Sequence, residues 1–146
     1  DEYLHKLSSF QKLAGASRAL AGEDYTTAAQ LYSQIDPDAI TDIDDGSGAS
    51  VEAYYKQLKD YFDDDGYVQL TRTGDRAYEN GDYDTAMNYY DLSIAVHPEN
   101  PVAFYKKGLC YIKQNNRSAA TELFTTIIND YPESSVAEMA KAERGY

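Results

Sequence analysis

The chain has 146 residues and a net charge of −12 at pH 7, with 42% hydrophobic residues. A length of this order suits one domain, and no apolar run approaches the ~20 residues that a membrane-spanning helix needs. Only 13 Lys and Arg stand against 25 Asp and Glu. Nucleic acid and anionic membrane surfaces, which both require clustered positive charge, are therefore not expected as partners.

The first predicted element is a helix pair over residues 9–36. The run DYTTA at 24–28 is nearly repeated as DYDTA at 82–86, and Ala16 stands twelve positions before the alanine of the first run. Small residues at these two places let the paired helices approach each other. Ile40 stands where proline follows the later copies, so the second helix of this degenerate copy is expected to be short.

Residues 37–66 form an insert that is absent from the later copies. Between Asp36 and Asp65 ten acidic residues face two lysines, so this stretch supplies −8 of the net charge of −12. Apolar residues recur at helical spacing over 51–62, which predicts an amphipathic helix. Residues 42–50, rich in Asp, Gly and Ser, are expected to be its flexible entry.

The insert has two interpretations. Its helix packs as one more helix of the fold, which we favour, or it lies in a groove and blocks it. Its acidic residues are a solvated loop or, alternatively, a surface for a basic partner. Their spacing does not match a calcium-binding EF-hand loop, so no metal site is predicted.

Residues 67–100 and 101–134 are two full copies of one pattern. Small or helix-breaking residues recur 34 positions apart, namely Gly74 with Gly108, Ala86 with Ala120 and Pro98 with Pro132. The bulky Tyr90 and Phe124 keep the same spacing and fill the space beside the small residues. Each proline follows a second helix that it cannot continue. The pattern predicts stacked two-helix units.

Residues 135–146 are expected to form a further first helix that lacks a second. Ala142 falls one period after Gly108, and Glu138 falls one period after Phe104. A polar residue in an aromatic position suits a capping helix, because a terminal unit must present a solvated outer face.

The segment ENGDYDTAMNYY at 79–90 resembles the central turn and second helix of the tetratricopeptide repeat (TPR) family, whose period is also 34 residues. The resemblance implies an all-α fold, a short right-handed helical solenoid of about three helix-turn-helix units. One unit is degenerate, and an inserted helix and a C-terminal capping helix complete the fold. A single TPR-like domain is expected over residues 1–146.

The resemblance also implies a concave groove that binds protein or peptide segments. In the family this groove is lined by first-helix residues at fixed places around the small residue. In the two full copies these are Val68, Thr71, Asp75, Tyr78 and Glu79, then Val102, Tyr105, Leu109, Ile112 and Lys113. The degenerate copy would add Phe10, Leu13, Ser17, Leu20 and Ala21.

The identity of these residues limits the kind of partner. Family members that grip a terminal carboxylate have Lys and Asn at two of the places, where this chain has Thr71 with Asp75 and Tyr105 with Leu109. Chaperone tails held by such a carboxylate clamp are therefore not expected. An extended or helical apolar segment is the expected occupant.

Catalytic, cofactor and metal constellations are not recognisable in the sequence. His5 and His97 are far apart and are expected to be exposed, and neither has a companion at metal-ligand or general-base spacing. Cys110 follows Gly108 on a half-buried helix and is expected to be a core residue. We therefore predict no enzymatic activity and no cofactor.

The pattern of residues 124–140 resembles the closing repeat of bacterial cell-envelope tetratricopeptide proteins. This resemblance favours an extracytoplasmic location over a cytoplasmic one. The predicted function is a non-catalytic interaction scaffold or adaptor that holds a protein or peptide segment in its groove. A domain of a larger bacterial envelope protein could have this role. The alternative is a regulatory module whose acidic insert occupies the groove or contacts a basic partner.

Overall fold

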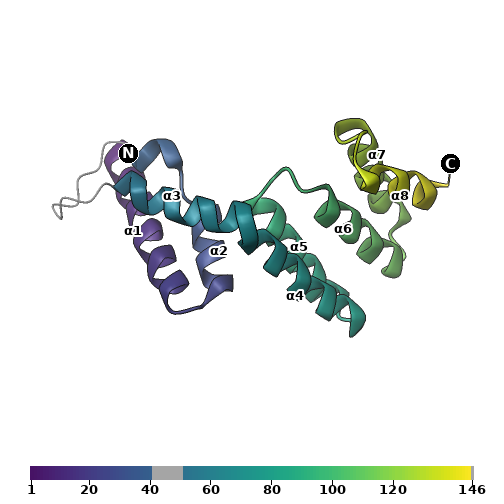
Figure 1. The fold of residues 1–146 in the computed structure, drawn as a ribbon, viewed down its shortest axis with the longest axis horizontal. Helices are drawn as coiled ribbons and strands as arrows, with labels where there is room; N and C mark the ends of the chain where they lie inside the picture. Colours follow the sequence, from purple (N-terminus) through teal and green to yellow (C-terminus); the bar gives the residue numbers. More distant parts are fainter. Residues whose placement is uncertain (41–50, 146) are drawn as a thin grey trace. The chain divides into compact units, whose positions relative to one another are not determined.

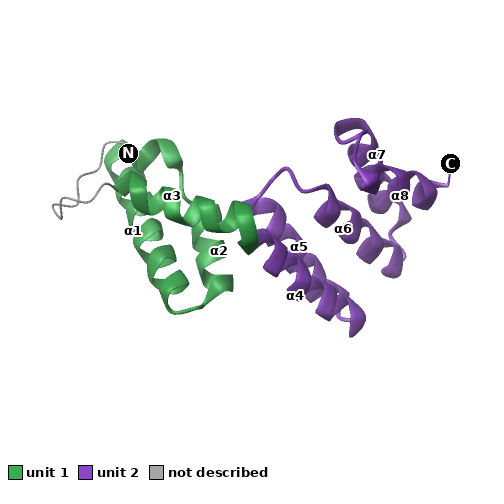
Figure 2. Ribbon diagram, in the orientation of Figure 1, with its two compact units in different colours: residues 1–66 green, residues 67–146 purple. Residues whose placement is uncertain are grey.

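The computed structural model describes residues 1–40 and 51–145, and within these ranges its regular structure is helical (Figure 1). The predicted flexible entry at 42–50 lies outside the described residues. The chain divides into two compact units, residues 1–66 and 67–146 (Figure 2). The single domain expected for the whole chain stays a prediction.

Unit 1 holds a helix pair and the insert. Its elements are α1 (Glu2–Ala21), α2 (Tyr25–Ser33), the 3₁₀-helix η1 (Pro37–Ile40), α3 (Val51–Tyr61) and the π-helical turn η2 (Phe62–Gly66). α1 packs against α2, while α3 packs against α1 and η1. α2 has 9 residues, against 14 in the second helices α5 and α7 of the later copies. The short second helix predicted from the sequence is thus present.

The insert helix contributes its apolar side to the core of unit 1. Val51, Leu58 and Phe62 are at most 2% exposed. The ring of Tyr32 stacks between those of Phe62 and Tyr55, at centroid distances of 4.8 and 5.5 Å. Burial of this ring raises the pKa of the Tyr32 hydroxyl well above its ordinary value. The helix predicted for 51–62 therefore exists, with its last turn passing into η2.

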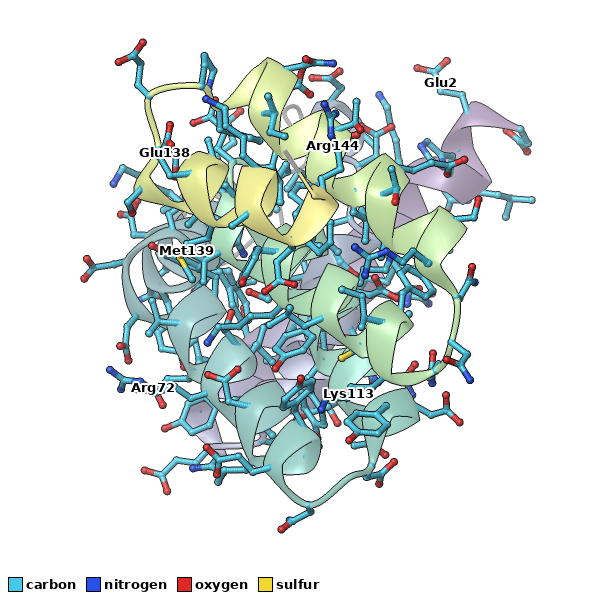
Figure 3. All side chains as sticks on the ribbon, turned by 90° about the vertical axis from the view of Figure 1, so that its right-hand side faces the viewer. Glu2, Arg72, Lys113, Glu138, Met139 and Arg144 are labelled. Atoms are coloured by element: carbon cyan, nitrogen blue, oxygen red, sulfur yellow. The ribbon has the colours of Figure 1, made fainter. Side chains whose placement is uncertain are left out.

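Unit 2 is a stack of helix pairs. Its helices are α4 (Tyr67–Glu79), α5 (Tyr83–Val96), α6 (Pro101–Lys113), α7 (Arg117–Asp130) and α8 (Ser135–Arg144). Each helix packs against the next one along the chain, and α8 also packs against α6 (Figure 1). The expected helix at residues 135–146 is α8. Glu138 and Met139 lie on its exposed side (Figure 3).

The periodic small residues form notches for buried aromatic rings. A Cβ atom added to Gly108 would lie 2.5 Å from Cε1 of Phe124, and one added to Gly74 would lie 2.6 Å from Cε1 of Tyr90. Both rings are 1% exposed. The 34-residue spacing therefore repeats one packing contact, in which the ring on the second helix fills the space left by the glycine on the first.

The turn inside each helix pair is also repeated, in unit 1 as well as in unit 2. A residue with positive φ precedes an N-cap residue whose side chain accepts from the backbone N–H three residues later. These pairs are Glu23 with Asp24, Gly81 with Asp82, and Asn115 with Asn116. Each N-cap bond is 3.2 Å long and satisfies one free donor of the helix start. The degenerate copy thus has the same helix-turn-helix construction as the full copies.

Candidate peptide-binding face

The first helices of the two full copies, α4 and α6, form two adjoining hollows in unit 2. The valine hollow, of about 330 Å³, is lined among others by Val68, Arg72, Pro101 and Val102. The tyrosine hollow, of about 300 Å³, is lined by Tyr78, Glu79, Tyr90 and Leu109. Asp75 and Lys106 line both hollows. We call this surface, with its two hollows, the groove face.

An ion pair stands where the two hollows meet. Nζ of Lys106 lies 2.6 Å from Oδ2 of Asp75, and the hydroxyl of Tyr90 donates to Oδ1 of the same carboxylate at 2.7 Å. The side chains of Lys106 and Asp75 are 30% and 31% exposed. Burial, and next the hydrogen bond to Asp75, raise the pKa of the Tyr90 hydroxyl, so Tyr90 stays a neutral donor. The buried Tyr90 side chain thus holds the Asp75 carboxylate of the ion pair in place.

Seven of the predicted groove residues line these hollows. They are Val68, Thr71, Asp75, Tyr78, Glu79, Val102 and Leu109. Val102 is 42% exposed, whereas Leu109 is half-buried and packs against the core of unit 2. The structure therefore brings residues from both full copies to one face.

Two predicted groove residues are core residues, which corrects the expectation that they face an open groove. Thr71 is 7% exposed, although it forms part of the wall of the valine hollow. Its hydroxyl donates to the carbonyl of Tyr67 at 2.9 Å and lies 2.8 Å from that of Ser93. Tyr105 is 9% exposed, and its hydroxyl donates to Glu143 of α8 at 3.3 Å. Thr71 is thus held within its own helix pair, whereas Tyr105 contacts the following helix α8.

Leu13, at the corresponding place in the degenerate copy, is also buried, at 3% exposure. It lines a hollow of about 200 Å³ in unit 1 together with Phe10 and Ser17 of α1 and Val51 and Tyr54 of α3. The insert helix therefore lies beside the residues that the degenerate copy would offer to a groove. Within unit 1 the insert helix is a packing element.

Ile112 and Lys113, the last predicted groove residues, lie outside the two hollows. Ile112 packs against the core of unit 2, and Lys113 is exposed. The sequence prediction in turn missed Arg72 and Lys106, although they stand 34 residues apart at the same place in the two copies. That shared basic character was the signal that could have identified them.

Cys110 and His97 pack within the fold, and His5 contacts a carboxylate. Cys110 is fully buried, as expected, and burial raises the pKa of its thiol to about 11. His5 is exposed and lies 2.8 Å from Asp36. His97 is half-buried and stacks on Tyr67 at 4.2 Å, so the expectation that it is exposed was wrong.

Residues 1–40 and 51–145, which the structure describes, contain no group of three or more His, Cys, Asp or Glu placed to hold a metal ion. No helix in the same ranges is long and apolar enough to cross a membrane.

Comparison with known proteins agrees with this architecture. The family model of the tetratricopeptide repeat matches residues 77–143. The TPR repeat-containing protein MJ1428 of Methanocaldococcus jannaschii is 19% identical over 91% of this chain, and the match spans 25% of that relative's length. Residues 77–143 belong to the tetratricopeptide repeat family, and the fold is an all-α helical solenoid of that type.

The family also indicates the general role of the chain. Repeats of this family are typically non-catalytic modules for protein–protein interaction. Neither description refers to a cell envelope, so the extracytoplasmic location stays a prediction. Because the chain spans about a quarter of the relative that it matches, the partners and role of the whole protein are matters for proposal.

Proposed function

We propose that this chain is a non-catalytic interaction module that binds a protein or peptide segment on the groove face of unit 2. The observation that carries the proposal is the pair of adjoining hollows at the groove positions of the family. Each hollow is at the lower end of the size range of ligand pockets, which suits one apolar side chain of a peptide. Their apolar walls supply affinity, and the ion pair between them supplies polar contacts.

The chemistry of the face supports binding and not catalysis. Both carboxylate oxygens of Asp75 accept hydrogen bonds, one from Tyr90 and one from Lys106. A general base needs an acceptor directed at its substrate, whereas each oxygen of this carboxylate already accepts a hydrogen bond from a neighbouring side chain. The buried Cys110 thiol, with its raised pKa, is a poor nucleophile. Recognition of a partner is therefore the role that these residues support best.

The insert gives less support to the alternative of a self-occupied groove. Val51, Leu58 and Phe62 are buried inside unit 1, so the apolar side of the insert helix is already used there. An occupant of the groove face would have to offer the same side chains a second time. The other form of the alternative, in which the acidic insert contacts a basic partner, is supported by Asp64 and Asp65, which are exposed in η2.

A matched pair of substitutions tests the proposed function. Val102→Asp places a charge in the valine hollow, whereas Met139→Asp places the same charge on α8, away from both hollows. The wild-type residues are 42% and 48% exposed, so neither variant is expected to unfold the chain, which circular dichroism checks. Proteins captured from a lysate by the wild type are purified, and their affinity for each variant is measured by titration calorimetry.

A partner that binds the Met139→Asp variant normally and the Val102→Asp variant at least tenfold more weakly is the expected result. Removing a carboxylate from water beneath an apolar side chain of the partner is unfavourable by more than the corresponding ~1.4 kcal/mol. Equal affinity for the two variants would place the binding site elsewhere and contradict the proposal.

A further inference from the structure

One side of α1 carries the residue spacing of a coiled-coil seam. Six residues follow one another at alternating intervals of four and three positions, which keeps them on one side of a helix. They are Tyr3, Leu7, Phe10, Ala14, Ser17 and Ala21. A different side of α1 faces the core of unit 1, with Ser9, Leu13 and Ala16 buried. We call the six residues the α1 seam.

The α1 seam is open at its N-terminal end and borders a hollow at its centre. Tyr3 is 69% exposed and Leu7 is 38% exposed. Phe10, Ala14 and Ser17 are half-buried and line the hollow of about 200 Å³ beside α3. An apolar cavity of about 150 Å³ can hold a benzene ring, so this hollow has room for a large apolar side chain.

The order of side-chain sizes along the α1 seam is self-complementary. The three residues of its first half are large, and the three of its second half are small. Each large residue has a small counterpart at the same distance on the other side of position 12. The pairs are Tyr3 with Ala21, Leu7 with Ser17, and Phe10 with Ala14. Two α1 helices that run in opposite directions about a twofold axis at this position set each large residue against a small one.

This arrangement fills the space between two helices better than a parallel one. Large residues opposite small ones interdigitate, whereas a parallel pair would set large against large at one end and small against small at the other. The twofold pair is isologous, because both copies use the same surface. Ala14 and Ser17 line the hollow, and their counterparts are Phe10 and Leu7 of the second copy. Each hollow thus receives apolar side chains from the other copy.

The charges of α1 also favour the antiparallel arrangement. Asp1 caps the helix and Glu2 lies in its first turn, whereas Arg18 lies in its last turn. Antiparallel helices place the acidic end of one copy beside the basic end of the other, and parallel helices place like charges together. With three basic residues against one acidic residue, α1 has a net charge of +2. The α1 seam therefore lies on an element that does not carry the acidic excess of the chain.

We propose that a second copy of this chain covers the α1 seam, in a twofold dimer whose two α1 helices pack side by side in opposite directions. The dimer involves unit 1 and goes beyond the proposed function, which concerns unit 2. Its test does not depend on a partner of the groove face.

Sedimentation equilibrium of the whole chain, from micromolar to near-millimolar concentration, tests the dimer. Leu7→Asp places a charge on the α1 seam, and Met139→Asp makes a matched change on α8. The wild-type residues are 38% and 48% exposed, and circular dichroism checks that both variants are folded. Wild type and Met139→Asp should show the same reversible monomer–dimer equilibrium. Leu7→Asp should dissociate at least tenfold more readily, because the dimer would remove its carboxylate from water.

Crosslinking tests the direction of the two helices. Tyr3→Cys and Ala21→Cys are prepared as separate variants and treated with a short bismaleimide, alone and as an equal mixture. The native Cys110 is buried and should not react. The mixture should give a crosslinked dimer on a denaturing gel, and neither variant alone should do so. In the antiparallel dimer two copies of the same cysteine lie about 27 Å apart along the helices, at 1.5 Å per residue.

Three results would overturn the inference. The first is a wild-type chain that stays monomeric over the whole concentration range. The second is equal dimerisation of Leu7→Asp and Met139→Asp, which would place the interface elsewhere. The third is crosslinking of Tyr3→Cys alone that is as strong as in the mixture, which would indicate parallel helices.

Discussion

The notch between Gly108 and Phe124 gives a quantitative test of how the repeats pack. In the Gly108→Ala variant the new methyl group would lie 2.5 Å from Cε1 and 2.8 Å from Cζ of a ring that is 1% exposed. Overpacking of this kind typically costs about 1–3 kcal/mol. Replacing a helical glycine by alanine returns about 1 kcal/mol of helix propensity. We therefore expect Gly108→Ala to lower the free energy of unfolding by up to about 2 kcal/mol.

A double-mutant cycle removes the propensity contribution from this comparison. In a Phe124→Leu background the smaller side chain leaves room for the methyl group, so Gly108→Ala should stabilise the chain by about 1 kcal/mol. Because the propensity gain occurs in both backgrounds, it cancels in the coupling energy, which should be about 1–3 kcal/mol. Urea unfolding followed by circular dichroism at 222 nm measures all four stabilities.

The result that would refute this reasoning is a coupling energy below about 0.5 kcal/mol, which is the additivity expected of independent sites. The same cycle at Gly74 and Tyr90 is a replicate, because a Cβ atom there would lie 2.6 Å from the ring and 3.2 Å from the carbonyl oxygen of Ala86. Coupling at one notch without coupling at the other would show that the repeated contact is not equivalent in the two copies.

Three further predictions concern single residues. Cys110, buried and with a thiol pKa raised to about 11, should react with Ellman's reagent at pH 8 only after unfolding in urea; prompt reaction of the native chain would contradict its placement. Gly81→Ala should cost about 1–2 kcal/mol in urea unfolding, since Gly81 has a φ of +79°; an unchanged midpoint would contradict this. The hydrogen bond from His5 lowers the pKa of Asp36, so its stabilisation exists above the ordinary carboxyl pKa and disappears as the pH falls through the lowered one. The advantage of wild type over His5→Ala in thermal melts should therefore vanish in acid, and an advantage that persists there would refute the assignment.

Much of the fold could be predicted because its determinants recur along the chain. The spacing of Gly74 and Gly108 identified the notches, since each glycine has to meet an aromatic ring of its own copy. The insert helix was predicted at 51–62 and found as α3 with its last residue in η2, because amphipathic periodicity is a local signal. Family spacing identified the helices that form the groove face.

The details of the face depended on contacts that a repeat pattern does not contain, some specific to one copy and others between copies. Thr71 is buried in a polar cluster with Ser93 and Asn100 that is specific to the first full copy. Tyr105 is buried because α8 follows it. The ion pair between Asp75 and Lys106 joins residues 31 positions apart, and neither residue's position in its own copy predicts that partner.

The most direct test of the groove face as a binding site is a ¹⁵N–¹H NMR titration of the whole chain with a purified partner captured by the wild type. The account predicts that the largest amide shift changes fall within residues 67–79 and 99–109 and around Tyr90, which together hold the residues of both hollows. The Met139→Asp variant should show the same pattern, and the Val102→Asp variant should lose it. Changes concentrated in residues 1–66, or in α7, which lines neither hollow, would contradict the account.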